Sequence, residues 1–185
     1  MSHHPLALPE VIETPRLILR KPIAPDDASP IFDSYACDPE VTRFLTWRPH
    51  YNLDESQRIL RTRVEWWNEG REFSWVITTK TDGAVIGMIS AADDDCPSRY
   101  SLGYVLARAH WGRGYMTEAA RTVVEFLLAQ PTITRVWAVA DFENVASMRV
   151  LENVGMQREG LLRKWSVHPA ISPVARDCWC FARVR

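Results

Sequence analysis

The decapeptide HWGRGYMTEA, residues 110–119, contains the clearest arrangement that could bind a ligand. Gly112 and Gly114 flank Arg113, and a helical pattern begins directly after them. Glycines let the backbone approach a bulky anion without a Cβ clash, and the first N–H groups of a helix, aided by its dipole, bind phosphate. Arg113 adds a cation and Thr117 a hydroxyl donor. We therefore predict that this loop binds a phosphate group.

The loop differs from the two common nucleotide-binding patterns. It lacks the G-K-[ST] ending with which a loop holds the terminal phosphates of a nucleoside triphosphate. Thr117 also occupies the third glycine position of the dinucleotide pattern G-x-G-x-x-G. Two glycines at this spacing also occur in an ordinary tight turn between a strand and a helix. The interpretation of the loop therefore depends on the elements around it.

Hydrophobic periodicity predicts a mixed α/β domain around this loop, with one central sheet. An N-cap is expected at Asp26 for the first helix and at Asn144 for the last. Of the adjacent Trp66 and Trp67, one should be less buried, because neighbouring helical residues face different directions. The expected strands are residues 16–23, 73–79, 84–92, 100–107, 134–140, 160–168 and 176–185, and the expected helices are residues 25–37, 54–70, 116–130 and 144–155.

Length and composition limit the class of protein. A chain of 185 residues is typical of one domain, and a net charge of −1 argues against nucleic acid as the main partner. No apolar stretch approaches the roughly 20 residues that a membrane span requires, and the N-terminus lacks a signal-peptide pattern. We expect a mobile segment at residues 1–12, one domain at residues 13–185, and a cytoplasmic location.

The cysteines do not predict a metal site. Cys37, Cys96, Cys178 and Cys180 form no C-x-x-C pair and have no accompanying histidine cluster. Free thiols in a reducing compartment explain them, and we expect no metal cofactor.

Three segments, in order along the chain, resemble the GNAT superfamily of N-acetyltransferases. The match is best with the branch of ribosomal-protein N-terminal acetyltransferases of the RimJ/RimL type. ETPRLILRKP resembles the opening strand of that branch, and LGYVLARAHWGRGYMTEA resembles its signature strand and pyrophosphate loop. NVASMRVLENVGMQREGLLR resembles its Asn-x-x-Ser helix and the turn and strands that follow. Trp111 and Met116 depart from the general superfamily loop, but tryptophan is usual there in this branch.

The resemblance implies a GNAT-like fold, a mixed α/β domain whose central, twisted, mostly antiparallel sheet is flanked by helices and splays apart between two central strands. Acetyl-CoA would occupy the splay. Its pantetheine arm would pair with the signature strand, and its pyrophosphate would lie on the loop. The implied cofactor-binding residues are Tyr104, Val105 and Leu106 on the strand and Gly112, Arg113, Gly114, Tyr115, Met116 and Thr117 in the loop.

The same resemblance assigns roles to two residues of the last helix. Ser147 matches a serine that acts on the leaving thiolate and is the predicted catalytic residue, although a serine at this helical position is also ordinary. Asn144 matches an asparagine that contacts the cofactor arm, and it can equally be a plain N-cap.

The general base is open. Many relatives carry a glutamate on the signature strand, whereas Ser101 stands at about that place here. A serine cannot act as a base unaided, so the alternatives are Glu65, the acidic run Asp93–Asp95, or a chain of water molecules. We favour a solvated loop for the acidic run.

A weak or water-mediated base favours an acceptor that loses its proton easily. A peptide α-amine has a pKa of about 8, so roughly a tenth of it is neutral at pH 7, whereas a lysine amine near 10.4 is neutral in about one molecule in a few thousand. We therefore predict an acetyl-CoA-dependent N-acetyltransferase that acts, by direct attack in a ternary complex, first of all on a protein N-terminus.

Two alternatives stay open. The acceptor can be a small-molecule amine, such as an amino acid, a polyamine or an aminoglycoside. The chain can also be a non-catalytic sensor that binds acyl-CoA, which the missing strand glutamate favours and Ser147 and Asn144 oppose. The sequence fits a monomer or a homodimer.

Overall fold

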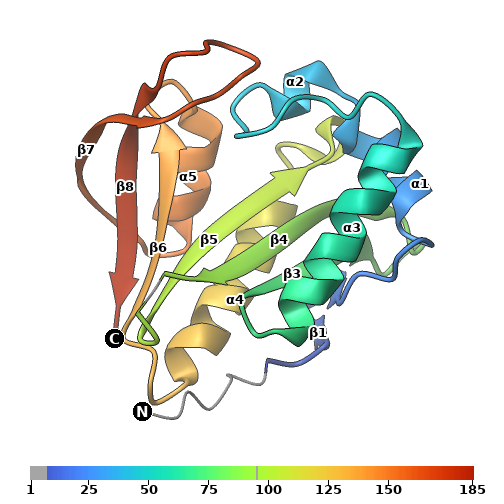
Figure 1. Cartoon of the computed structure of the whole chain (residues 1–185). Helices are drawn as coiled ribbons and strands as arrows, with labels where there is room; N and C mark the ends of the chain where they lie inside the picture. Colours follow the sequence, from blue (N-terminus) through green and yellow to red (C-terminus); the bar gives the residue numbers. More distant parts are fainter. Residues whose placement is uncertain (1–7, 95) are drawn as a thin grey trace.

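Eight strands form one sheet that lies between two groups of helices (Figure 1). The computed structural model describes residues 8–94 and 96–185. The sheet order is β1-β2-β3-β4-β5-β6-β8-β7. The strands are β1 (Val11–Glu13), β2 (Leu17–Arg20), β3 (Glu72–Thr79), β4 (Val85–Asp93), β5 (Arg99–Leu106), β6 (Arg135–Asp141), β7 (Gln157–Ser166) and β8 (Arg176–Val184), and the helices are α1 (Ala28–Ile31), α2 (Pro39–Thr42), α3 (Leu53–Asn68), α4 (Tyr115–Ala129) and α5 (Val145–Asn153).

The sheet opens between β5 and β6. These strands run parallel, whereas the other neighbouring strands are antiparallel. They pair only where both begin, from Arg99 with Arg135 to Ser101 with Trp137. Beyond that point they diverge, as Figure 1 shows. The expected splay of the two central strands is therefore confirmed.

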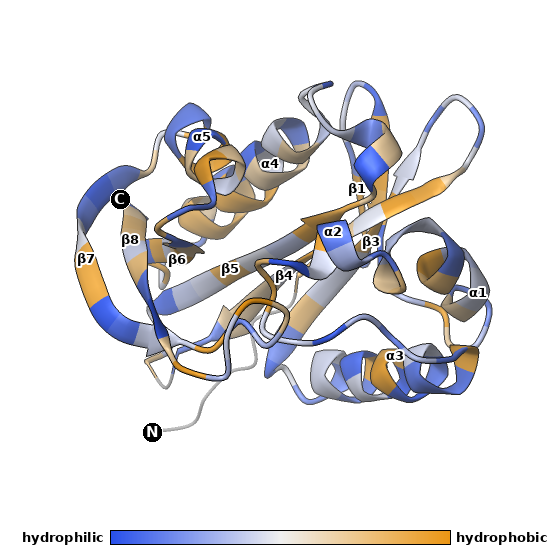
Figure 2. Cartoon of the chain, turned by 90° about the horizontal axis from the view of Figure 1, so that it is seen from above, coloured by the Kyte–Doolittle hydropathy of each residue, from blue (hydrophilic) through white to orange (hydrophobic). Residues whose placement is uncertain are grey.

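Helices cover both faces of the sheet (Figure 2). Helix α4 packs on one face, together with α5, through a stripe of apolar residues at helical spacing. Helices α1 and α3 pack on the other face, where Leu60 and Val76 lie in a second, smaller core. The buried stripe of α4 consists of Met116, Ala119, Ala120, Val123, Val124 and Leu127, as the sequence pattern predicts.

The principal elements agree with the sequence-based expectations. The hairpin of β3 and β4, the strands β5, β6 and β8, and the helices α3, α4 and α5 lie where periodicity places them. Trp67 is 7% exposed and packs edge-on against Phe73 and Trp75, whereas Trp66 is half-buried beside two arginines. The two tryptophans therefore differ in burial as expected.

The first helix is shorter than expected. Helix α1 is followed directly by a π-helix, Phe32–Ala36, and its N-cap is Asp27 rather than Asp26. The Asp27 carboxylate is buried and accepts hydrogen bonds from Arg20 Nη1, 2.7 Å away, and from the backbone N–H of Ile23. This tertiary ion pair fixes the start of the helix, and the local sequence does not reveal it.

The packed domain begins before residue 13. The expected mobile segment was residues 1–12, and residues 1–7 of it lie outside the described residues. Leu8 and Ile12 are buried in the main core, and β1 pairs with β2 from Val11 to Glu13. Burial of Ile12 and the hydrogen bonds to β2 hold this segment, which is too short for its period to stand out in the sequence.

The described residues were also compared with the requirements of a membrane-spanning helix and of a metal site. Among residues 8–94 and 96–185, no helix is long and apolar enough to cross a membrane. The same residues contain no group of three histidine, cysteine or acidic side chains arranged to hold a metal ion.

Candidate functional site

The loop before α4 presents a row of unpaired backbone donors. Gly112 and Gly114 have φ angles of +72° and +76°, in the left-handed region that side chains disfavour. Gly114 is the N-cap of α4 and supplies no side-chain cap. Within the described residues, none of the backbone N–H groups from Gly112 to Thr117 donates a hydrogen bond. Unpaired N–H groups at the start of a 15-residue helix form a site for an anion.

Strand β5 turns further backbone groups toward the splay. Successive residues of an antiparallel strand direct their N–H and C=O groups to opposite sides. The Ala107 N–H donates to Ile86 O, and a Cβ added at Gly87 would lie 2.4 Å from Val105 O, so residues 105 and 107 face β4. Tyr104 and Leu106 therefore direct their backbone groups toward the gap beside β6. Of the three strand residues expected to pair with pantetheine, these two are suitably oriented, whereas the backbone of Val105 is turned to β4.

The side chain of Trp111, in the loop, forms a hydrogen bond with one of these backbone groups. Its indole Nε1 donates to Leu106 O over 2.7 Å, although 48% of the residue is exposed. The contact ties the loop to the end of β5. The departure of Trp111 from the general superfamily pattern thus has a structural consequence, because the indole links the two segments expected to bind the cofactor.

The side chain of Tyr104 joins β5 to α5 across the splay. Its hydroxyl lies 2.8 Å from Ser147 Oγ and 3.2 Å from the Ser147 carbonyl oxygen. Burial raises the pKa of Tyr104 well above its usual range, and the hydrogen bond with Ser147 only partly offsets this. Both groups are therefore neutral hydroxyls near pH 7. The sequence identified both residues but did not predict their contact.

Asn144 acts as the N-cap of α5. Its side-chain oxygen accepts the Ser147 N–H over 3.1 Å, and its own N–H donates to Asp141 O. The capping alternative for Asn144 is thus observed. The cap fixes the first turn of α5 and, with it, the position of Ser147 opposite Tyr104.

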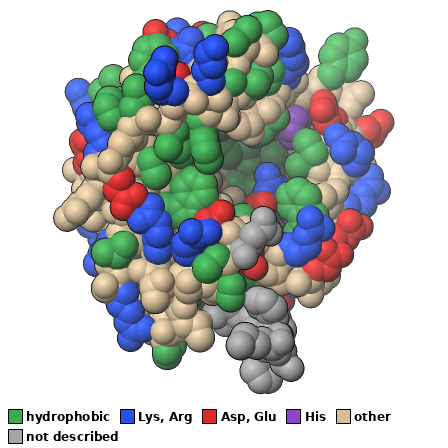
Figure 3. Space-filling view, turned by 60° about the vertical axis from the view of Figure 1, so that its left-hand side comes forward, with side chains coloured by type: hydrophobic (Ala, Val, Ile, Leu, Met, Phe, Trp, Pro, Cys, Tyr) green, Lys and Arg blue, Asp and Glu red, His purple; other side chains and the backbone are tan. Residues whose placement is uncertain are grey.

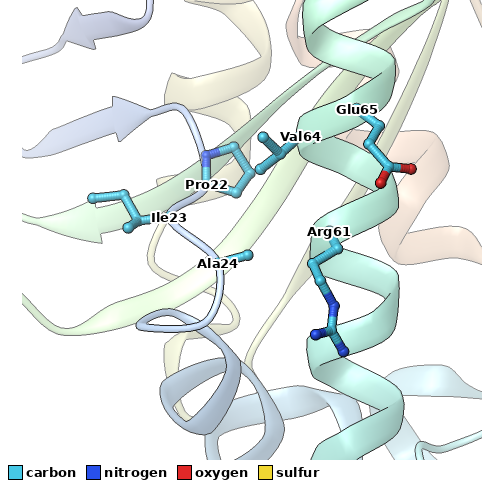
Figure 4. Close-up of a pocket in the computed structure, with 6 residues that line it drawn as sticks. All are labelled: Pro22, Ile23, Ala24, Arg61, Val64 and Glu65. Atoms are coloured by element: carbon cyan, nitrogen blue, oxygen red, sulfur yellow. The ribbon is translucent and has the colours of Figure 1, made fainter.

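The acidic residues considered as bases lie elsewhere. Glu65 lines a shallow pocket between α3 and the segment after β2, together with Pro22, Ile23, Ala24, Arg61 and Val64 (Figure 4). Asp94 accepts from Trp137 Nε1 over 3.1 Å and pairs with Arg99, and Asp93 lies at the end of β4. Asp95 is outside the described residues. No hydrogen bond or ion pair that the structure describes joins Glu65, Asp93 or Asp94 to Tyr104 or Ser147.

Ser101 stands where β5 and β6 are still paired. It is the partner of Trp137 at the last paired position, and its hydroxyl donates to Ala92 O over 3.4 Å. It therefore belongs to the closed end of the splay, whereas Tyr104 and Ser147 lie where the strands have separated.

A buried ion-pair network, which the sequence did not reveal, closes the far end of β6. Asp141 is 2% exposed, and Arg176 Nε donates to its Oδ2 over 2.7 Å. Arg176 also pairs with Glu143 over 2.6 Å, and His168 Nε2 lies 3.5 Å from Asp141. Burial opposes ionisation of Asp141, but the hydrogen bonds from Arg176 and Glu143 and the nearby positive charge lower its pKa. Asp141 thus joins the β6–α5 corner to the segment between β7 and β8.

The surface around this network, which we call the apolar rim, exposes several apolar side chains. Phe142 and Val145 follow β6 and are 43% and 49% exposed, and Arg176 stacks over the Phe142 ring at 4.8 Å. In the segment between β7 and β8, Val167 and Val174 are also exposed. Figure 3 shows a hollow in the surface with hydrophobic side chains on its walls.

Comparison with protein families gives one match that covers most of the chain. The sequence profile described as Acetyltransferase (GNAT) domain matches residues 16–157. Among curated proteins, the uncharacterized N-acetyltransferase p20 of Bacillus licheniformis is 30% identical over 157 residues, which are 84% of this chain and 87% of p20.

Solved structures share the fold at low sequence identity. RimL, the ribosomal L7/L12 alpha-N-protein acetyltransferase solved with coenzyme A, has a TM-score of 0.83 at 18% identity, over 95% of this chain and 98% of its own. The microcin C7 self-immunity acetyltransferase MccE, solved with acetyl-CoA and AMP, has a TM-score of 0.83 at 19% identity, over 93% and 94%. At these identities the likeness establishes the architecture.

Proposed function

The chain belongs to the acetyltransferase (GNAT) family of acetyl-CoA-dependent N-acetyltransferases, and from that premise we propose that it acetylates the α-amine of a peptide or protein N-terminus. Acetyl-CoA, when bound, supplies the thioester carbon that the amine attacks. The main observation that supports cofactor binding here is the row of unpaired N–H groups from Gly112 to Thr117 beside the open edge of β5. These residues fit a pyrophosphate. The backbone of Tyr104 and the N–H of Leu106, whose carbonyl accepts from Trp111, fit the backbone-like amides of a pantetheine arm.

Ser147 is the proposed catalytic residue, as a hydrogen-bond donor to the leaving sulfur. When the Tyr104 hydroxyl donates its hydrogen bond to Ser147 Oγ, the serine hydroxyl is free to donate a hydrogen bond in turn. A thiol has a pKa of about 8.5 and a tyrosine about 10, so full proton transfer to the thiolate costs at least about 2 kcal/mol even from an unperturbed tyrosine. Burial raises the pKa of Tyr104 further. The pair therefore stabilises the thiolate by hydrogen bonding. The proton that converts this thiolate to the CoA thiol comes from the nitrogen of the acetylated amine.

The positions of the candidate acidic bases favour an α-amine as the acceptor. Glu65, Asp93 and Asp94 form no described hydrogen bond or ion pair with the Tyr104–Ser147 pair, which supports a water molecule as the acceptor of the amine proton. Water-mediated deprotonation suits an α-amine, which is neutral about two to three orders of magnitude more often than a lysine amine at pH 7.

The β6–α5 corner supports a peptide over a polycation. Asp141 and Glu143 both pair with Arg176, so neither carboxylate is unpaired, while Phe142 and Val145 expose apolar surface. A polyamine or an aminoglycoside needs unpaired carboxylates, whereas the side chains of a peptide N-terminus can pack on an apolar rim. The fold neighbour RimL, named for its action on a ribosomal-protein N-terminus, adds support by analogy.

An acceptor panel tests the proposal through release of the CoA thiol. The panel contains a lysine-free peptide with a free N-terminus, the same peptide with a blocked N-terminus and one internal lysine, spermidine, and an aminoglycoside. We expect turnover with the first peptide above all others. Faster turnover of the lysine peptide, spermidine or the aminoglycoside would reject the α-amine proposal. Binding of acetyl-CoA without thiol release from any amine would instead favour the sensor alternative.

A further inference from the structure

An arginine far away in the sequence holds the loop before α4. Arg16 lies in the turn between β1 and β2, and its guanidinium group contacts three parts of the loop and helix. Arg16 Nη1 donates to Arg113 O over 2.9 Å, and Nε donates to Glu118 Oε2 over 2.6 Å. The guanidinium carbon lies 4.5 Å from the centroid of the Tyr115 ring. The side chain is 47% exposed, so it is accessible beside the loop.

The hydrogen bond to Arg113 O sets the direction of a neighbouring donor. In a trans peptide, the carbonyl of one residue and the N–H of the next point in opposite directions within one plane. Because Arg16 holds the Arg113 carbonyl on its own side, the Gly114 N–H is turned to the opposite side. Gly114 has a left-handed φ of +76° and can rotate at lower cost than a residue with a side chain. An external contact is therefore needed to keep this peptide in one orientation.

Arg16 also pairs with the carboxylate of Glu118, a negative charge that opposes phosphate binding. Glu118 lies in the first turn of α4, where a carboxylate repels a bound anion. Thr14 Oγ1 donates to Glu118 Oε1 over 2.6 Å, and the backbone N–H of Arg16 donates to the same oxygen over 2.9 Å. Burial raises the pKa of Glu118, but these hydrogen bonds and the Arg16 guanidinium outweigh burial and lower it. The carboxylate therefore stays ionised, with the positive charge of Arg16 beside it.

We propose that Arg16 is a positioning residue for cofactor binding, which orients the Arg113–Gly114 peptide and offsets the charge of Glu118 so that the loop accepts a pyrophosphate. The inference rests on the proposed phosphate role of residues Gly112–Thr117. It adds a residue from the first hairpin to the cofactor half of the site. Arg16 acts through the loop and is distinct from the residues that contact the reacting atoms.

The test compares two ligands that differ in the pyrophosphate. CoA contains the pyrophosphate and nucleotide, whereas pantetheine lacks both. Calorimetric titration with CoA, and competition titration with pantetheine, would be run on the parent protein, Arg16→Ala and Arg158→Ala. Arg158 is the matched control, because its side chain is 45% exposed and pairs with Glu152, a residue of α5. We expect Arg16→Ala to weaken CoA binding roughly tenfold, as for the loss of a charge-assisted hydrogen bond, and to leave pantetheine binding unchanged within about twofold.

Arg16→Lys separates geometry from charge. Lysine keeps the positive charge, but it lacks the planar fork that reaches the Arg113 carbonyl and the Glu118 carboxylate together. We therefore expect partial recovery of CoA affinity. Full recovery would show that charge alone is sufficient and would overturn the positioning role.

The remaining outcomes also decide the question. An equal loss of CoA and pantetheine affinity in Arg16→Ala, or no loss of either, would overturn the proposal. Unchanged CoA binding by a folded Gly114→Glu variant would show that the loop proposal itself is wrong, and the role of Arg16 would be rejected with it. Circular dichroism checks that each variant is folded. If Arg16→Ala is unfolded, Arg16→Gln carries the same comparison.

Discussion

The two sides of the β5–β6 splay use different chemistry. On the proposed cofactor side, the described donors are backbone N–H groups, set by the left-handed glycines Gly112 and Gly114 and by the start of α4. On the β6 side, which we propose faces the acceptor, the corner after β6 is organised by side chains, in which Asp141 joins Arg176 and His168. A backbone site depends on a few glycines and tolerates other changes. A side-chain network depends on each of its members.

A substitution in the backbone site should have the largest effect on function. Gly114→Glu forces a side chain into a left-handed backbone conformation, adds a negative charge to the proposed phosphate loop, and puts its Cβ 3.5 Å from Nη2 of Arg16, which holds that loop. We expect acetyl-CoA affinity to fall by about a thousandfold, that is by about 4 kcal/mol, while the fold persists. Calorimetric titration with acetyl-CoA measures the loss.

The matched control for this prediction is a glycine with the same conformation outside the loop. Gly83, in the turn between β3 and β4, has a φ of +71° and no atom within 4 Å of an added Cβ. Gly83→Glu carries the same backbone strain and the same charge, so it should retain acetyl-CoA affinity. Equal loss in both variants would mean that strain, and not the phosphate cradle, explains the result.

A substitution in the side-chain network should reduce stability at pH 7. Asp141→Asn keeps the shape of the side chain but removes the charge that pairs with Arg176, a hydrogen-bonded pair whose carboxylate is fully buried. We expect the free energy of unfolding to fall by about 2 kcal/mol at pH 7. Urea unfolding measures the change. Glu159→Gln, which breaks the more exposed pair with Arg135, should cost less than about 1 kcal/mol.

The same variant has a defined dependence on pH. The pKa of Asp141 is lower in the folded protein than in the unfolded chain. Its ionised form therefore stabilises the fold above the unfolded carboxyl pKa of about 3.9, and this contribution disappears as the pH falls through the folded pKa. The stability difference between the parent and Asp141→Asn should shrink on acidification below about pH 4. A difference that stays constant would contradict a role for the Asp141 charge.

This contrast also explains what the sequence could predict. Backbone sites leave local signatures, so the glycine spacing, the periodicity of α4 and the Asn144 cap were all visible in a single sequence. The network around Asp141 joins residues up to 35 positions apart, and Arg16 reaches Arg113 across 97 positions. Such pairs have no local pattern. The short strand β1 was missed for another reason, because three residues are too few for their period to stand out. The π-helix that follows α1 was also missed.

The contact between Tyr104 and Ser147 lies between these two cases, and it provides the prediction with the smallest effect. The sequence indicated both residues, but only the splay brings their hydroxyl groups to 2.8 Å. If Ser147 donates a hydrogen bond to the leaving sulfur, Ser147→Ala should lower kcat by roughly tenfold and leave the Kd for acetyl-CoA unchanged. Turnover of the preferred peptide of the acceptor panel measures kcat.

Tyr104→Phe sharpens this prediction. It removes the phenolic hydroxyl that orients Ser147 but keeps the serine hydroxyl itself, so we expect a smaller loss of kcat, of about threefold. The double variant should then be no slower than Ser147→Ala alone, because the tyrosine acts only through the serine. Additive losses would instead assign Tyr104 a separate contact with the reacting group. A rise in the Kd with constant kcat would move both residues from the chemistry to cofactor binding.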